Sequence, residues 1–166
     1  MPTILHVIFG PSGAGKTTYA LDLARRTPAV HFAIDDWMAR LYAPDMPQPL
    51  EFEWMMARVE RCEALIWSLA AGVMATGSSV VLDLGLMRKG DRDRVREIAQ
   101  ACELTTQFHH VTAPHDVRRA RVLARNSGQG ESFAIVVTPQ MFEFTERIYQ
   151  APEAEELVGC VVSDST

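Results

Sequence analysis

The stretch Gly10-Pro11-Ser12-Gly13-Ala14-Gly15-Lys16-Thr17 fits the pattern G-x-x-x-x-G-K-[ST] at every fixed position. An apolar run at 4–9 precedes it, which is typical of a buried parallel strand. A segment with helical spacing of its apolar residues follows at 18–26. Strand, glycine-rich loop and helix are the context in which this pattern builds a phosphate-binding loop. A glycine-rich turn that binds nothing is the less favoured interpretation.

The residue types of this stretch suit a triphosphate. Gly10, Gly13 and Gly15 allow positive φ angles, so that the backbone can turn its N–H groups inward. The helix that opens near Lys16 adds free N–H groups and the positive end of its dipole. The Lys16 ammonium can reach the β- and γ-phosphates, and the Thr17 hydroxyl can ligate Mg²⁺. We expect nucleotide contacts from Gly10, Pro11, Ser12, Gly13, Ala14, Gly15, Lys16, Thr17 and Thr18.

Composition places the chain among ordinary globular proteins. The 166 residues suffice for one domain with a real core, and 48% of them are hydrophobic. The net charge of −5 argues against non-specific binding to nucleic acid or to an anionic membrane. Three widely spaced cysteines without a C-x-x-C pair indicate reduced thiols in a cytoplasmic protein. No apolar run approaches transmembrane length.

Apolar runs alternate with helical patterns along the chain. Strands are expected at 4–9, 29–34, 79–84, 105–111 and 157–162. Helices are expected at 18–26, 37–42, 51–76, 91–102, 114–126 and 139–149. This alternation predicts an α/β fold, a parallel sheet with helices on both faces. Ligands of such sheets bind outside the carboxyl ends of the strands, and the glycine-rich loop and two of the aspartates below follow strands.

The long segment at 51–76 has apolar residues at alternating steps of three and four, which is one helical face. These residues are Phe52, Met55, Val59, Cys62, Ile66, Leu69 and Val73. We expect this face to pack inward.

Asp83 ends the apolar run of the third strand. A carboxylate delivered to the phosphate edge by an apolar strand can hold Mg²⁺ directly or through water. Many strands end in Asp before a turn, so a capping role stays equally open.

Asp35 and Asp36 end the second strand. A positioned carboxylate can accept the proton of an attacking hydroxyl in phosphoryl transfer, whereas Asp is also a favoured N-cap for a helix at Trp37. We assign Asp35 as the base and Asp36 as the cap.

Arg118, Arg121 and Arg125 stand at steps of three and four and share one helical face. A glycine-containing loop follows at 127–132. A lid that closes on transferring phosphates is favoured over a solvated face, because Mg²⁺ and one lysine leave much triphosphate charge uncovered. None of the five histidines is spaced as part of a ligand set, and structural roles are expected for them.

With these residues placed, the chain resembles the small P-loop kinases of the adenylate-kinase-like group. Within it, the branch of AAA-type ATP-binding proteins that includes phage polynucleotide 5′-kinase, zeta toxins and chloramphenicol phosphotransferase is most similar. The likeness covers nearly the whole chain. It rests on residues 10–17, Asp35-Asp36, Asp83, Arg121, Arg125, Asn126 and residues 137–144.

The resemblance implies a three-layer P-loop NTPase fold with a five-stranded parallel sheet and a small lid. It implies an ATP-dependent phosphotransferase with Lys16 and Thr17 at the phosphates and Mg²⁺, and with Asp35 as the base. Arg121 and Arg125 would be lid arginines, with Arg121 also at the nucleotide. Arg88, beyond the third strand, is a candidate acceptor contact. The region between Trp37 and Cys62 matches no particular branch, so the acceptor stays open.

The sequence as a whole predicts one domain over residues 1–166, with an acceptor-binding region at 36–77 and a lid at 115–138. The favoured function is a kinase that moves the γ-phosphate of ATP to a hydroxyl of a small molecule. A polynucleotide 5′-hydroxyl kinase is the first alternative, although it needs a basic, aromatic-lined groove that the acidic residues near Trp54 disfavour. A regulatory protein that binds and slowly hydrolyses ATP without an acceptor is the second alternative. The oligomeric state is not indicated.

Overall fold

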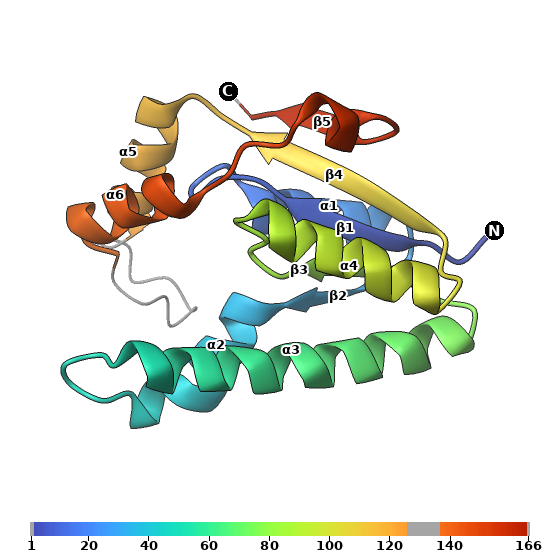
Figure 1. Cartoon of the computed structure of the whole chain (residues 1–166), viewed down its shortest axis with the longest axis horizontal. Helices are drawn as coiled ribbons and strands as arrows, with labels where there is room; N and C mark the ends of the chain where they lie inside the picture. The colour runs from blue at the N-terminus through green and yellow to red at the C-terminus, as the bar shows by residue number, and fades with distance from the viewer. Residues whose placement is uncertain (1, 126–136, 166) are drawn as a thin grey trace.

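A five-stranded, all-parallel sheet forms the centre of the molecule in the computed structural model, which describes residues 2–125 and 137–165 (Figure 1). The strand order is β2-β3-β1-β4-β5. The strands are β1 (Leu5–Phe9), β2 (Ala29–Ala33), β3 (Ser79–Asp83), β4 (Thr106–Thr112) and β5 (Val161–Asp164). The expected α/β sheet is confirmed. Among the described residues, no helix combines the length and the apolar composition that crossing a bilayer requires.

Each predicted helix is present. The helices are α1 (Lys16–Arg26), α2 (Ile34–Tyr42), α3 (Phe52–Ala75), α4 (Lys89–Ala101), α5 (His115–Arg125) and α6 (Pro139–Ile148), with short 3₁₀ turns η1 (Ala43–Asp45) and η2 (Ala154–Leu157). Two boundaries differ from the prediction by several residues. Helix α2 begins three positions earlier than expected, and β5 begins later because η2 occupies the start of the expected strand.

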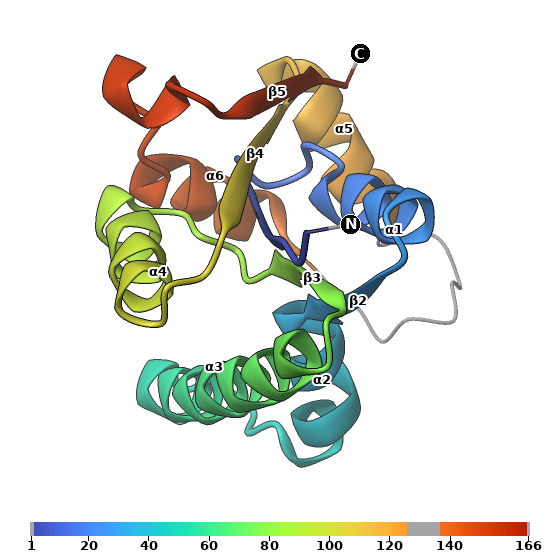
Figure 2. The same ribbon diagram turned by 90° about the vertical axis from the view of Figure 1, so that its right-hand side faces the viewer.

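Side chains that alternate along β1 build two hydrophobic layers. Leu5, Val7 and Phe9 pack with residues of α3 and α4, whereas Ile8 packs with residues of α1. Figure 2 shows α1 and α5 on one side of the sheet and α4 on the other. This three-layer arrangement follows from the near-continuous apolar strands, which need cover on both faces.

The topology brings three predicted features to one edge. Strands β1 and β3 are neighbours in the sheet. The connection from β1 runs to β2 at one end of the sheet, whereas the connection from β3 runs to β4 in the opposite direction. Ligands of open α/β sheets bind at such a switch point, outside the carboxyl ends of the strands. The glycine-rich loop follows β1 here, Asp83 ends β3, and Asp35 follows β2.

Helix α3 is longer than the sheet that it covers. Its buried residues begin only at Cys62, after ten residues of the helix, and continue with Ile66, Ala70 and Met74. Figure 1 shows the first half continuing beside α2, past the carboxyl ends of β2 and β3. The expectation that the whole apolar face packs inward was wrong at Phe52 and Leu69, which are 72% and 42% exposed. Phe52 is the first residue of α3, at the end that lies beside α2, and Leu69 directly precedes the buried Ala70.

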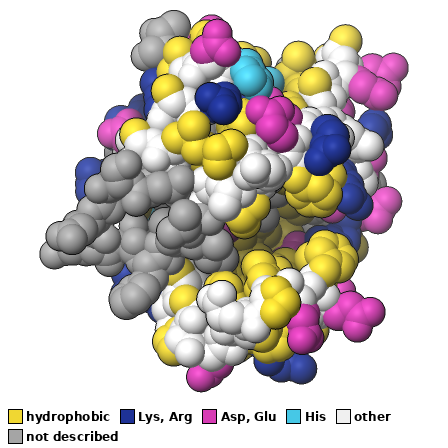
Figure 3. Space-filling view, turned by 90° about the vertical axis from the view of Figure 1, so that its left-hand side faces the viewer, with side chains coloured by type: hydrophobic (Ala, Val, Ile, Leu, Met, Phe, Trp, Pro, Cys, Tyr) yellow, Lys and Arg dark blue, Asp and Glu magenta, His cyan; other side chains and the backbone are white. Residues whose placement is uncertain are grey.

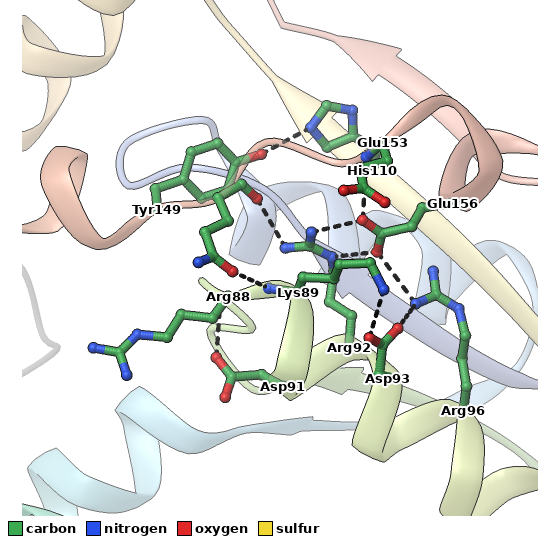
Figure 4. A network of polar contacts seen from close by, with 11 residues as sticks. Arg88, Lys89, Asp91, Arg92, Asp93, Arg96, His110, Tyr149, Glu153 and Glu156 are labelled. Carbon is green, nitrogen blue, oxygen red and sulfur yellow. Dashed lines mark hydrogen bonds and ion pairs between the residues drawn. The ribbon is translucent and has the colours of Figure 1, made fainter.

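An ion-pair network fastens the C-terminal segment to α4 (Figure 4). The Arg92 side chain is fully buried, donates to both carboxylate oxygens of Glu156 at 2.7 and 2.9 Å, and donates to the Gln150 carbonyl at 3.0 Å. Arg96 also donates to Glu156, at 3.2 Å. The hydrogen bonds from Arg92 hold the pKa of Glu156 at about 2. The chain that leads into β5 is therefore bound to the body of the fold through charge as well as through the sheet.

Candidate active site

Two glycines of the loop at residues 10–17 lie so close to neighbouring backbone that no side chain fits there. A Cβ atom at Gly10 would lie 1.9 Å from the Val111 carbonyl oxygen, and one at Gly13 would lie 2.5 Å from the Arg118 carbonyl oxygen. Both glycines have positive φ angles, as predicted. Helix α1 begins directly afterwards at Lys16. The first N–H groups of α1 and the turn before it therefore form the anion-binding geometry that phosphates require.

Lys16 lies at the centre of a group of charges. Its Nζ atom donates to the Pro11 carbonyl at 2.9 Å, within its own loop. Burial lowers the pKa of the ammonium, and the negative charges of Asp83 and Asp35 oppose that shift. Arg125 acts on the same ammonium with a positive charge. One lysine, two carboxylates and an arginine therefore lie within electrostatic range of one another.

Thr17 and Asp83 meet at the switch point between β1 and β3. The Thr17 hydroxyl donates to Asp83 Oδ2 at 2.7 Å, and Asp83 is buried. Among the described residues no cluster of three or more His, Cys, Asp or Glu side chains could enclose a metal. Mg²⁺ commonly takes only one or two protein ligands and completes its shell with water and phosphate oxygens. A hydroxyl and a carboxylate beside the phosphate loop fit that donor set.

Asp35 and Asp36 have different surroundings, and the assignment of Asp36 as the helix cap is corrected. Helix α2 begins at Ile34, so Asp35 and Asp36 lie in its first turn and neither is the N-cap. The cap prediction for Asp36 was wrong because Ile34 and Met38, four residues apart, are both buried and place the helix start earlier. Asp36 instead accepts from Arg40 Nε at 2.8 Å on the exposed side of the helix.

Asp35 has no hydrogen-bond or ion-pair partner within residues 2–125 and 137–165. It retains access to solvent, yet enough protein surrounds it that desolvation raises the pKa of its carboxyl, and the negative charge of Asp83 raises it further. Lys16 and Arg125 act in the opposite direction. An unpaired carboxylate with a raised pKa, beside a phosphate loop, has the properties of a proton acceptor.

The three arginines of α5 have different surroundings. Arg118 is buried and does not belong to an open phosphate-facing surface, so this part of the predicted triple-arginine face was wrong. It donates to both carboxylate oxygens of Glu146 at 2.6 and 2.7 Å, to the Ala113 carbonyl at 2.9 Å and to the Ser12 carbonyl at 3.2 Å. The reason is that α6 packs over the first turn of α5. Glu146 had no sequence signal, because an ion pair between two helices leaves no local spacing.

Arg121 and Arg125 are more exposed to solvent than Arg118. Arg121 donates to the Ser165 hydroxyl at 2.7 Å and to its carbonyl at 3.3 Å. Arg125, at the end of α5, is exposed, and its charge acts on both Lys16 and Asp35. The predicted loop at 127–132 and most of the remaining lid up to 138 lie outside the described residues.

The face at which the strands end is hollowed (Figure 3). Hydrophobic side chains line much of the hollow that is visible in this view. Arg88 is the N-cap residue of α4 and is exposed. Its side chain points away from the ion-pair network in Figure 4. Its backbone N–H donates to Asp91 Oδ2 at 3.0 Å.

Known families and structures agree with this geometry. A family model described as an AAA domain, AAA_33, matches residues 5–146. No curated protein sequence matches the chain. A sugar kinase from Janibacter sp. HTCC2649 shares the fold at 23% identity and a TM-score of 0.64, with 98% of this chain and 86% of that chain covered.

Two further solved structures have the same fold. A candidate kinase from Chloroflexus aurantiacus J-10-fl is 17% identical with a TM-score of 0.73, and 99% of this chain and 89% of that chain are covered. A gluconokinase from Sinorhizobium meliloti 1021 is 20% identical with a TM-score of 0.57, and 98% and 82% are covered. The family match spans the loop, all the aspartates and the arginines described above. The chain therefore belongs to the AAA_33 family of AAA domains and has the fold of a small P-loop kinase.

Proposed function

We propose that this protein is an ATP-dependent kinase that transfers the γ-phosphate to a hydroxyl group of a small molecule. The observation that carries the proposal is the Asp35 carboxylate, which has no pairing partner among residues 2–125 and 137–165 and lies at the same sheet edge as the phosphate loop. Desolvation by the surrounding protein raises its pKa, and the charge of Asp83 raises it further, although the side chain keeps access to solvent. A protein that only binds nucleotide needs no proton acceptor there. The sugar kinase and gluconokinase folds support a small-molecule acceptor, at low sequence identity.

The proposed mechanism assigns one task to each group. The loop N–H groups and Lys16 hold the phosphates, and Asp35 orients the acceptor hydroxyl and takes its proton. The hydroxyl oxygen forms a bond to the γ-phosphorus while the bond from that phosphorus to the bridging oxygen breaks, and ADP leaves. Arg125 and Arg121 stabilise charge on the transferring group. Mg²⁺ held near Thr17 and Asp83 would neutralise phosphate charge. Positioning and charge supply most of the catalysis in this reaction class.

The proposal extends to the regions of the domain. Residues 36–77 would bind the acceptor, because α2 and the first half of α3 border the carboxyl edge of the sheet. Residues 115–138 would form the lid, and Arg121 and Arg125 lie at its start.

The Asp35→Asn variant tests the kinase proposal. Asn retains the size of the side chain and removes its basicity, so ATP should bind with near-normal affinity while transfer falls by about a hundredfold or more. Asp36→Asn is the matched control, because the hydrogen bond of Asp36 within the described residues goes to the exposed Arg40 of its own helix. Calorimetry measures ATP affinity, and ADP release in an alcohol screen measures transfer. Equal transfer by the wild type and Asp35→Asn would remove the base assignment.

A further inference from the structure

We propose that the acceptor alcohol carries an aryl or bulky alkyl group, which packs against Phe52 and Met56 at the start of α3. This inference rests on the proposed function and names the class of its acceptor. It starts from the part of α3 that extends beyond the sheet.

The direction of Phe52 follows from helix geometry. Phe52, Val59 and Ile66 are spaced seven residues apart, about two turns of an α-helix, and so they share one face. Ile66 is completely buried in the core beneath the sheet, and Val59 packs against the same core. Phe52 therefore projects from α3 toward the side on which the sheet lies. It does so beyond the end of the strands, and it is 72% exposed.

The neighbours of Phe52 extend the same apolar surface. Met56 is one turn away and is 37% exposed, and Met55, between them, packs partly against the core. Scattered exposed hydrophobic residues are ordinary on protein surfaces. These residues differ because Phe52 has the heptad spacing of the core-facing residues Val59 and Ile66, and Met56 lies one turn from it on the same exposed end of the helix. Methionine adapts its shape to an apolar ligand, and a phenylalanine ring offers a face or an edge for aromatic packing.

The place of this surface connects it to the chemistry. The first half of α3 lies beside α2, which carries Asp35 in its first turn, and both border the edge where the phosphate loop follows β1. Figure 3 shows hydrophobic side chains around the hollow of this edge. Small-molecule sites are lined mostly by apolar and aromatic side chains, with a few polar groups that orient the ligand. Asp35 would supply the polar group for the hydroxyl, and Phe52 with Met56 would supply the apolar wall.

Two matched pairs of acceptors test the inference. Phenyl β-glucoside is compared with methyl β-glucoside, and 3-phenyl-1,2-propanediol is compared with 1,2-propanediol, with ADP release as the readout. Within each pair the free hydroxyl groups are the same, and the phenyl group is present in one compound only. We expect the phenyl compound of at least one pair to have a kcat/KM at least about tenfold higher, because a buried phenyl ring removes a large apolar area from water.

Variants then assign this preference to the surface. Phe52→Ala should abolish the difference within the pair by raising the KM of the phenyl compound, while the KM of ATP stays unchanged. Phe52→Leu should retain most of the preference. Leu65→Ala is the matched control, because Leu65 is 49% exposed on the same helix but lies away from the catalytic edge and should change nothing.

The outcomes separate the two proposals. Transfer that Asp35→Asn abolishes, but that is equal within both pairs and insensitive to Phe52→Ala, would overturn the inference and leave the kinase function standing. Absence of transfer to any alcohol, with ATP still bound, would overturn the kinase function and the inference with it. A dimer that Phe52→Ala dissociates, without any change in acceptor preference, would overturn the inference by identifying the surface as a subunit contact.

Discussion

The charges of Lys16, Asp35, Asp83 and Arg125 influence one another, and each affects the protonation of its neighbours. The Lys16 ammonium is buried, which disfavours its charged form, and the carboxylates of Asp83 and Asp35 offset that effect. Desolvation by the surrounding protein, followed by the charge of Asp83, raises the pKa of Asp35, although its side chain keeps access to solvent. A bound phosphate would add negative charge beside Asp35 and Asp83. The positive charges of Lys16 and Arg125 would then be needed to balance it.

At this scale we predict unequal roles for Arg121 and Arg125, the two arginines proposed to act on the transferring phosphate. Arg125→Ala should lower kcat by about tenfold to a thousandfold with little change in the KM of ATP, since charges on a transferring phosphoryl group matter most in the transition state. Arg121→Ala should have a smaller effect, because its guanidinium is engaged by Ser165. Steady-state kinetics at saturating acceptor provides the measurement.

Arg119→Ala serves as the control for both variants. Arg119 is exposed on the same helix and lies 3.9 Å from Glu143, so its loss should leave kcat unchanged. Full turnover by Arg125→Ala, or a larger loss for Arg121→Ala, would contradict the assignment.

At the scale of elements, Arg118 connects three parts of the fold. It belongs to α5, pairs with Glu146 of α6 and donates to the Ser12 carbonyl of the phosphate loop. The close approach of Gly13 to the Arg118 carbonyl adds a second contact between the loop and α5. The shape of the loop is therefore tied to the helix pair α5 and α6.

We predict that Glu146→Gln lowers both stability and ATP affinity. Removing one charge of a largely buried pair leaves the Arg118 guanidinium uncompensated, which should reduce the free energy of unfolding by about 2–4 kcal/mol. The loop should hold its shape less well, so ATP should bind more weakly. Urea unfolding and calorimetry measure the two effects.

Glu143→Gln is the control on the same helix. Its partner Arg119 is exposed and 3.9 Å away, and the change should lower stability by less than about 0.5 kcal/mol. The coupling between loop and helices would be refuted by a Glu146→Gln protein with wild-type stability and wild-type ATP affinity.

The sequence predicted elements well where local patterns determine them. Short apolar runs gave the strands, and the glycine-rich loop was predictable because its backbone demands glycine at defined positions. The start of α2 was misjudged because Asp is both a good cap and a good first-turn residue, and only the burial of Ile34 decides between them. Arg118 shares a helical face with Arg121, and no local spacing reveals that Glu146 covers it.

For the molecule as a whole, buried histidines couple stability to pH. His109 lies between two partners, with its Nε2 atom 3.0 Å from His6 Nδ1 and its Nδ1 atom 2.9 Å from the Tyr19 hydroxyl. A neutral ring can accept at one nitrogen and donate from the other, so this chain is satisfied without charge. Burial, followed by the effects of His6 and Arg26, lowers the pKa of His109 to about 4.

We predict that stability falls as pH decreases from neutrality toward 5. The unfolded His109 takes up a proton near its ordinary pKa of about 6.5, whereas the folded residue stays neutral until about 4, so the unfolded state binds more protons between these values. The loss should be on the order of 1–2 kcal/mol by pH 5. Urea unfolding at a series of pH values measures it.

His109→Gln should flatten this dependence, because Gln does not titrate. Glu156 acts in a different range, since its lowered pKa of about 2 contributes stability that is lost only as pH falls below the ordinary value of about 4.5. The raised pKa of Asp35 and the lowered pKa values of three other histidines are common to both proteins, so the difference in slope between the wild type and His109→Gln isolates His109. The assignment to His109 fails if both proteins lose stability with the same slope.

The buried pair of Arg92 and Glu156 has a consequence for the order in which a newly made chain can fold. Synthesis proceeds from the N-terminus, and Glu156 follows Arg92 by 64 residues, a delay of about 3–13 s at typical rates of translation. During that interval the guanidinium, which stays charged, has no carboxylate to accompany it into the interior. Helix α4 can therefore complete its docking only after η2, which carries Glu156, has been translated, so a residue late in the sequence decides when a helix near its middle becomes native.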